Sequence, residues 1–264
     1  MANIVLLTDF GFRDEYVGIV KGVILKINPQ AQILDLTHEI PPQDVAWTAY
    51  CLASAYKFFS KETIFLCVVD PGVGTKRKII IVKTKDYFFV APDNGILTRV
   101  LEKDNPEKII AVRNKKFFLP EISSTFHGRD IMAPVAAYLS RGVALSEFGP
   151  EIKMIKKIAL PEVIIKDKCI SGEIIHIDHF GNLITNIDKN FFAQVIKKNK
   201  FFIKIKDKKI FRINTSYSQS KKGELLAIWG SRNLLEIAVS QGSAVKELRI
   251  KKGEQVTINL IIDA

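Results

Sequence analysis

The chain has 264 residues, of which 47% are hydrophobic and 25% charged, so it can bury a full core as one large domain or two modest ones. No apolar run approaches the ~20 residues that a membrane span needs, and residues 1–10 lack the basic segment of a signal peptide. The three cysteines are widely spaced and odd in number, which predicts a cytoplasmic protein with reduced thiols and neither a disulfide framework nor a zinc site.

In the first half of the chain, apolar strands alternate with amphipathic helices. Val17, Val20 and Ile24 have the spacing of one helical face, and Asn28-Pro29 ends that helix. This alternation predicts an α/β domain with a mostly parallel sheet and flanking helices. The expected strands are 3–8, 32–36, 64–69, 78–83 and 87–91; the expected helices are 14–27, 42–59 (with Pro42 in the first turn) and 129–139.

After Pro150 the pattern changes to short β-type segments, and only residues 189–197 are plainly helical. This predicts a smaller, mainly antiparallel β domain, which divides the chain into domains 1–155 and 156–264. The expected strands are 162–166, 171–178, 183–186, 201–205, 209–213, 225–229 and 256–261.

The net charge of +11 is uneven, with +2 over residues 1–150 and +9 over residues 151–264. Lysines in the second half alternate with β-type residues such as Phe202 and Ile203. Such a surface attracts phosphate and would suit nucleic acid. Lysine on the solvent face of an exposed strand also protects its edge from pairing with other chains, and this interpretation is favoured. We therefore expect no nucleic-acid partner.

Asp70 and Arg77 flank a turn rich in Gly and Pro. Asp70 follows an apolar run and is expected at the carboxyl end of a buried strand. Arg77 follows seven residues after Asp70, close enough in the sequence to share a pocket with it. His127 lies in a second turn, Thr125-Phe126-His127-Gly128-Arg129-Asp130. A carboxylate, a guanidinium and an imidazole together could orient a water and tune its acidity. Each residue alone also fits a plain structural role, as an ion pair across a turn or a helix cap.

Three further segments accompany these two: Thr8-Asp9-Phe10-Gly11, Asp178-His179-Phe180-Gly181-Asn182 and residues 230–239. In that order and at those spacings, the five segments resemble the S-adenosylmethionine hydroxide adenosyltransferases. These are water-using relatives of the enzymes that attach fluoride or chloride to S-adenosylmethionine. The resemblance covers essentially the whole chain. It implies hydrolysis of S-adenosylmethionine to adenosine and L-methionine, by in-line attack of an activated water on the ribose 5′ carbon.

The resemblance also assigns roles to individual residues. Asp70, Arg77 and His127 activate the water: the guanidinium stabilises developing hydroxide, while the carboxylate and the imidazole accept hydrogen bonds or the proton. Asp9 takes the ribose hydroxyls. The substrate-binding residues that it implies are Asp9, Asp70, Asn182, Ser231, Glu236 and Val239.

An assembly is implied as well. The family resemblance indicates a homotrimer in which the substrate lies between the first domain of one subunit and the second domain of its neighbour.

No metal or redox cofactor is expected, because the sulfonium departs as neutral methionine and needs no acid. Phe180 or Trp47 could provide an aromatic wall, although an aromatic residue more often belongs to the core. Taken singly, Ser231, Arg232 and Glu236 also fit an exposed turn.

Three alternatives stay open at this point. His38, His176 and His179 could serve a metal-dependent hydrolase, and the basic second half could serve a nucleic-acid-binding module. Within the family, the nucleophile could be a halide. At the position of Asp70, the halogenating relatives resemble one another in that each has an uncharged residue. At about 4 Å and an effective dielectric near 20, a carboxylate would repel a halide by roughly 4 kcal/mol, so water is expected.

Overall fold

The structure, a computed structural model, describes residues 3–166, 169–197 and 199–261. It divides into two compact units, Met1–Ala159 and Leu160–Ala264. The sequence places the corresponding boundary after residue 155, within the same connecting segment. In the described part of the chain, no helix is long and apolar enough to cross a membrane. All three cysteines are free thiols, and of these Cys67 is fully buried.

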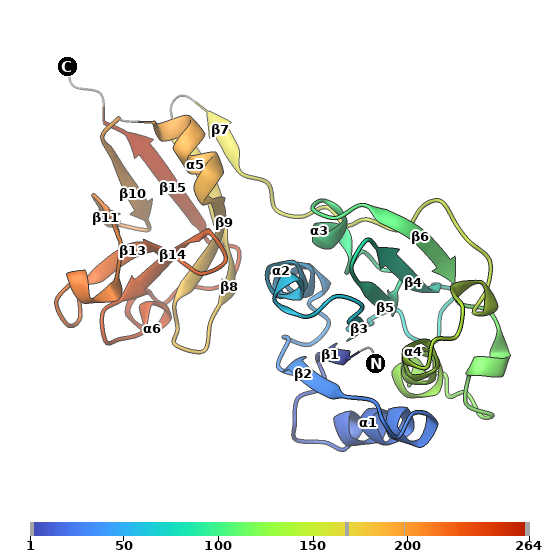
Figure 1. Cartoon of the computed structure of the whole chain (residues 1–264). Coiled ribbons are helices and arrows are strands. Elements are labelled where there is room, and N and C mark those ends of the chain that lie inside the picture. Colours follow the sequence, from blue (N-terminus) through green and yellow to red (C-terminus); the bar gives the residue numbers. More distant parts are fainter. Residues whose placement is uncertain (1–2, 167–168, 198, 262–264) are drawn as a thin grey trace. The chain divides into compact units, whose positions relative to one another are not determined.

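Unit 1 contains a six-stranded sheet in the order β2-β1-β3-β5-β4-β6 (Figure 1). The strands β2, β1, β3 and β5 pair in parallel, whereas β4 is antiparallel to both β5 and β6. The prediction of a mostly parallel sheet is therefore confirmed in part: the sheet is mixed, because β4 and β5 form an antiparallel hairpin and β6 pairs antiparallel with β4. The strands are β1 (Ile4–Thr8), β2 (Ile33–Thr37), β3 (Ile64–Val68), β4 (Ile79–Thr84), β5 (Phe88–Pro92) and β6 (Pro106–Ala111).

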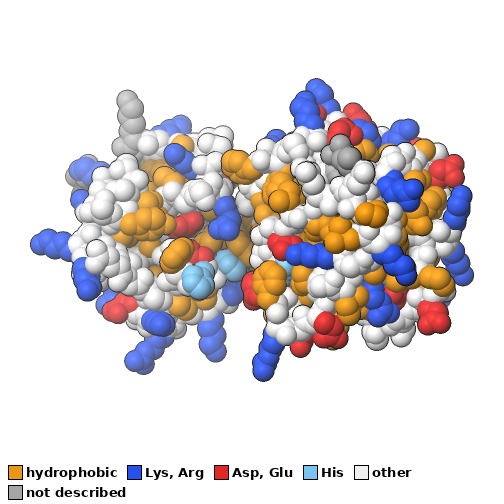
Figure 2. Space-filling view, turned by 60° about the horizontal axis from the view of Figure 1, so that its bottom comes forward, with side chains coloured by type: hydrophobic (Ala, Val, Ile, Leu, Met, Phe, Trp, Pro, Cys, Tyr) orange, Lys and Arg blue, Asp and Glu red, His pale blue; other side chains and the backbone are white. Residues whose placement is uncertain are grey.

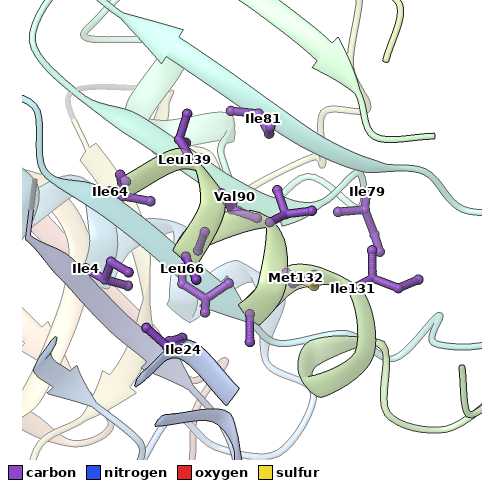
Figure 3. Close-up of a cluster of buried hydrophobic side chains, with 14 of the residues drawn as sticks. Ile4, Ile24, Ile64, Leu66, Ile79, Ile81, Val90, Ile131, Met132 and Leu139 are labelled. Atoms are coloured by element: carbon purple, nitrogen blue, oxygen red, sulfur yellow. The ribbon is translucent and has the colours of Figure 1, made fainter. Parts of the chain in front are cut away.

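Helices lie on both faces of this sheet (Figure 1). On one face, α1 (Tyr16–Ile27) packs against α4 (Ala133–Ser140), and on the other α2 (Val45–Ala55) packs against the short α3 (Thr98–Leu101). Alternate strand residues such as Ile4, Ile64 and Leu66 point into the core beneath α1 and α4 (Figure 3). The alternation along β1 and β3 thus buries both faces, and the polar residues that follow each strand emerge at its carboxyl end.

Two helices of unit 1 begin differently from the prediction. Helix α2 begins at Val45 and not near Pro42, because the Asp44 carboxylate caps it by accepting a hydrogen bond from Trp47 N at 2.9 Å. The 129–139 helix begins as a π-helical turn, η3 (Gly128–Met132), before α4. Strand β6 and helix α3 were not predicted. Short 3₁₀ turns complete the unit: η1 (Tyr56–Phe58), η2 (Lys115–Phe117) and η4 (Leu145–Glu147).

Unit 2 is β-rich, and the nine strands in its described residues pair antiparallel apart from β12 with β13 (Figure 1). The main path runs β11-β10-β15-β8-β9-β14-β13-β12, and β7 adds to β8. The strands are β7 (Ile164–Lys166), β8 (Cys169–Ile177), β9 (Leu183–Asp188), β10 (Phe201–Ile205), β11 (Lys208–Ile210), β12 (Ile213–Asn214), β13 (Leu225–Trp229), β14 (Leu234–Val239) and β15 (Gln255–Leu260).

The strand expected over 209–213 is interrupted, since β11 ends at Ile210 and β12 begins at Ile213. Helix α5 (Lys189–Ile196) matches the prediction, and Asp188 caps it. The fully buried β14, the helix α6 (Ala244–Leu248) and the 3₁₀ turn η5 (Tyr217–Gln219) were not predicted. Strand β14 lies between β9 and β13, and this position pairs Glu236 and Ile237 with the start of β9, whose other edge pairs with the end of β8.

Candidate active site

A cavity of about 250 Å³ lies at the carboxyl edge of the unit 1 sheet and is lined by Asp9, Asp70 and His127. Thr8 pairs with Val68 where β1 and β3 run in parallel. The residues after each strand therefore emerge side by side, as ligand-binding residues do in parallel sheets. His127 comes from the segment that precedes η3. Three of the five sequence motifs thus meet at one cavity.

Asp70 and Arg77 form a buried ion pair, with side chains 6% and 10% exposed. Arg77 Nε donates to Asp70 Oδ1 at 3.0 Å and to Oδ2 at 2.8 Å, and Nη2 also donates to Oδ2. This is a multidentate contact, which fixes the orientation of the carboxylate as well as its charge. The pair predicted from the spacing of these residues is therefore present, and Asp70 lines the cavity.

Arg77 also joins His127, because its Nη2 lies 3.0 Å from His127 Nδ1. A guanidinium can only donate, so Nδ1 must accept and the neutral ring carries its proton on Nε2. Burial lowers the pKa of His127, and the charge of Arg77 lowers it further. His127 is therefore neutral near pH 7. With its lone pair engaged by Arg77, the ring offers a donor and not the proton acceptor that the sequence suggested.

Asp9 is held by the main chain of a neighbouring loop. Its Oδ2 accepts a hydrogen bond from Gln43 N at 2.8 Å, and Gln43 reaches this position with a φ of 64°. Burial raises the pKa of Asp9, the Gln43 bond opposes that effect, and the nearby charge of Asp70 raises it further. Gln43 also lines the cavity and was not recognised in the sequence, since a backbone N–H donor leaves no mark in residue type.

Unit 2 has a cavity of its own, of about 740 Å³. All four binding residues predicted in this half line it: Asn182, Ser231, Glu236 and Val239. Phe180 also lines it and is 73% exposed, whereas Trp47 is buried within unit 1 and lines neither cavity. Of the two aromatic residues considered, Phe180 alone is placed to contact a ligand.

Asn182 is fixed by Asp178. The two carboxylate oxygens of Asp178 accept hydrogen bonds from Asn182 N at 2.8 Å and from Asn182 Nδ2 at 3.0 Å. Asp178 lies in the motif but was not predicted as a site residue, although it also lines the cavity. The paired bonds orient the Asn182 amide, so that its oxygen has one defined direction in which to accept.

Glu236 is a buried carboxyl, 5% exposed, at the centre of β14. It accepts a hydrogen bond from Tyr217 Oη at 3.2 Å. Burial raises the pKa of Glu236, and burial beside this carboxyl raises the pKa of Tyr217 to about 12. A Cβ at Gly230 would lie 1.7 Å from Glu236 Oε1, so only glycine leaves room for the carboxyl. Tyr217 is a further lining residue that the sequence did not indicate.

Of the histidines considered for the alternative metal site, His38 is held by two polar side chains. His38 is fully buried, with Nδ1 2.8 Å from Thr8 Oγ1 and Nε2 3.0 Å from Asp35 Oδ1. Within residues 3–166, 169–197 and 199–261, no three His, Cys, Asp or Glu side chains are grouped so that they could hold a metal ion. His38 instead anchors the Thr8–Gly11 turn, since its carbonyl also accepts a hydrogen bond from Gly11 N at 2.8 Å.

Basic side chains do not form a single tract on the face shown in Figure 2; they project separately, with uncharged and acidic groups between them. This distribution agrees with solvated strand faces, the interpretation favoured for the positive second half of the chain.

Comparison with known proteins matches both units to one family. The family model described as the SAM hydroxide adenosyltransferase N-terminal domain matches residues 4–149, and that of the C-terminal domain matches residues 172–257. A protein of Thermus thermophilus named (R)-S-adenosyl-L-methionine hydrolase is 32% identical over 98% of this chain and 100% of its own length. A protein of the same name from Methanocaldococcus jannaschii is 35% identical over 97% of this chain and 95% of its own.

Two further matches are informative. A fluorinase of Actinoplanes sp. is 30% identical over 70% of this chain and 72% of its own length. The crystal structure of an uncharacterized conserved protein from Thermotoga maritima is 38% identical, with a TM-score of 0.90 over 97% of this chain and 99% of that one.

Proposed function

The chain belongs to the SAM hydroxide adenosyltransferase family, and on that premise we propose that it hydrolyses S-adenosyl-L-methionine to adenosine and L-methionine. Full-length relatives named (R)-S-adenosyl-L-methionine hydrolase support this reaction. The observation that carries the proposal is the Asp70–Arg77–His127 chain of hydrogen bonds, of which the two end residues, Asp70 and His127, line a cavity at the carboxyl edge of the sheet.

The chemistry needs little beyond a positioned water. As the water oxygen bonds to the 5′ carbon, the C5′–S bond breaks, and its electron pair leaves with sulfur as the neutral thioether of methionine. The water must lose one proton, and it must be held in line with the departing sulfur. Asp70 accepts a hydrogen bond from the water and then its proton, while Arg77 stabilises the developing hydroxide. His127 orients Arg77 and offers its Nε2–H to the reacting oxygen.

Binding is divided between the two units. Asp9 accepts hydrogen bonds from the ribose hydroxyls in the unit 1 cavity. Asn182, Ser231, Glu236 and Val239 contact the methionine or adenine portion in the unit 2 cavity. We propose that the two cavities combine across subunits of a homotrimer, with unit 1 of one subunit meeting unit 2 of its neighbour. Light scattering should give the mass of a trimer, and a fully active monomer would exclude this arrangement.

The reaction as proposed uses neither metal nor redox cofactor, because every acting group is an ordinary side chain and the leaving group needs no Lewis acid. The proposed binding partner is the substrate, S-adenosylmethionine, and neither nucleic acid nor a membrane takes part in the reaction. Three free thiols suit a reducing cytoplasm, where we place the enzyme. Full activity is expected after exhaustive chelation; activity lost to chelator and regained only with a divalent ion would favour the metal-dependent alternative.

The decisive experiment is turnover of S-adenosylmethionine in water enriched in oxygen-18. Chromatography and mass spectrometry should identify methionine and an adenosine that carries one heavy oxygen. Heated protein and Asp70→Asn are the matched controls, since S-adenosylmethionine also decomposes without enzyme. Formation of methylthioadenosine, or of adenosine without the label, would contradict attack by water at the 5′ carbon.

A further inference from the structure

We propose that Asn94 is a positioning residue that fixes the separation of Asp70 and Arg77. Its kinetic consequence rests on the function proposed above, whereas its structural consequence does not. Asn94 belongs to the turn Pro92-Asp93-Asn94-Gly95, which begins at the last residue of β5. None of the five sequence motifs includes this turn.

Asp70 and Arg77 come from strands that are not neighbours. Asp70 follows β3, Arg77 precedes β4, and β5 lies between these two strands. The chain from 70 to 77 must therefore pass the end of β5, where the Pro92–Gly95 turn lies. A turn in this place can hold the main chain on both sides of the ion pair.

Two hydrogen bonds of this turn do that. Asn94 Nδ2 donates to the carbonyl of Val69 at 2.8 Å, one residue before Asp70. Asp93 N donates to the carbonyl of Lys78 at 2.9 Å, one residue after Arg77. Val69 is fully buried and lies just beyond the last residue of β3, so its carbonyl needs a partner outside the β3 ladder. The Asn94 amide supplies it.

The turn itself is rigid. Asn94 Oδ1 accepts from Ile96 N at 3.2 Å, and Asn94 N donates to Pro92 O at 2.9 Å. Gly95 has a φ of 98°, and a Cβ there would lie 2.4 Å from Ile158 Cγ2. The amide of Asn94 therefore presents its donor to Val69 from a backbone that is fixed on both sides, and little freedom remains for it to point elsewhere.

Asn114 offers a matched control in the same unit. Its Nδ2 donates to the carbonyl of Glu147 at 2.7 Å, and its Oδ1 accepts from Lys116 N at 3.1 Å. This is the same pair of bonds that Asn94 makes, in a residue of similar partial burial, and Asn114 lines neither cavity described above. A loss of turn stability alone should affect both asparagines alike.

The first test compares Asn94→Ala, Asn94→Asp, Asn114→Ala and Asn114→Asp, each shown by circular dichroism to be folded at the assay temperature. Asp retains the acceptor that closes the turn but cannot donate to a carbonyl when ionised. We expect both Asn94 variants to lower kcat by about 10- to 100-fold with little change in KM, because a small misplacement of catalytic groups costs this much. Both Asn114 variants should keep the wild-type kcat.

The second test needs no turnover. The chain has four histidines, so the ring protons of His127 can be followed by NMR and assigned by their loss in His127→Asn. The charge of Arg77 lowers the pKa of His127, whereas the charges of Asp70 and Asp130 raise it. If loss of the Asn94 amide displaces Asp70 relative to Arg77, the His127 titration should shift in Asn94→Ala and stay unchanged in Asn114→Ala.

The outcomes separate the two proposals. A wild-type protein that does not convert S-adenosylmethionine would refute the function, while the histidine titration would still decide the role of Asn94. Wild-type kcat together with an unmoved His127 titration in Asn94→Ala would overturn the positioning role. An Asn94→Asp protein that matches wild type would equally overturn it, because the amide donor would then be dispensable.

Discussion

Arg77 donates to Nδ1 of His127 over 3.0 Å, and this bond leaves the imidazole with its proton on Nε2. An asparagine at position 127 can reproduce both functions, with an amide oxygen to accept and an amide N–H to donate, whereas leucine can reproduce neither. Loss of a hydrogen bond to a charged group costs about 1.5–3 kcal/mol. We therefore expect His127→Leu to lose at least ~10-fold more turnover than His127→Asn.

The comparison is made by measuring kcat for both variants at pH 7. If the ring acted as the general base, asparagine would be as damaging as leucine, because an amide does not take up a proton near neutral pH. Equal losses in the two variants would therefore contradict the tautomer assigned here.

Replacing Asp70 by asparagine should reduce turnover by about 100-fold or more, the scale expected for losing a positioned acid–base group. Binding should change less, since the loss falls on the transition state. The measurement is kcat and KM from adenosine release. Asp86→Asn is the control, because Asp86 forms a surface ion pair with Lys61 at 3.0 Å in the same unit. Near wild-type hydrolysis by Asp70→Asn would exclude the proposed mechanism.

Glu236→Gln should stabilise the protein and weaken substrate binding. Burial raises the pKa of Glu236 above its ordinary value of 4.5, so the folded state holds a proton more readily than the unfolded state. The associated stability is present below pH 4.5 and is lost as the pH rises through the folded pKa. Glutamine avoids the ionised, buried form and can still accept from Tyr217.

Thermal unfolding over a pH series checks this expectation. Glu236→Gln should melt above wild type at neutral pH, and the difference should shrink toward pH 4.5, the ordinary value of the carboxyl. The exposed Glu224→Gln should show no such trend. A neutral-pH melting temperature below that of wild type would argue against a destabilising carboxyl at this position.

No 5′-chloro or 5′-fluoro product is expected, even at high halide concentration. A halide beside Asp70 would meet a like charge, at a cost of roughly 4 kcal/mol at about 4 Å and an effective dielectric near 20. The assay is mass spectrometry of products formed by the wild-type protein in saturating chloride or fluoride. Accumulation of halogenated adenosine would assign the chain to the halogenating branch of its family.

Much of the fold and of the candidate site could be predicted from the sequence, wherever a local pattern determines the structure. The apolar runs of β1 and β3 place Asp9 and Asp70 at one sheet edge, because parallel strands end together. Strand β14 was missed for the opposite reason. It is buried along its whole length, so it lacks the polar alternation that distinguishes a half-exposed strand from any other apolar run.

The partners of the site residues were harder to anticipate. Gln43 holds Asp9 through a main-chain N–H, and Asn94 contacts a carbonyl 25 positions earlier in the chain. Bonds of this kind depend on the path of the backbone and not on residue spacing. Trp47 belongs to the core, the alternative that the sequence left open, because an aromatic residue suits a buried helix as well as a ligand wall and burial in α2 depends on tertiary packing.

The Pro92–Gly95 turn is hydrogen-bonded to the main chain next to Asp70 and next to Arg77, and these bonds do not involve the side chain at position 70. A replacement of that side chain therefore leaves these two main-chain bonds in place. Exchange of the group that meets the nucleophile then needs a new partner for the Arg77 guanidinium, and not a new backbone path. Relatives of this chain that are named hydrolases and others that are named fluorinases are what such a division between backbone and reactive group would produce.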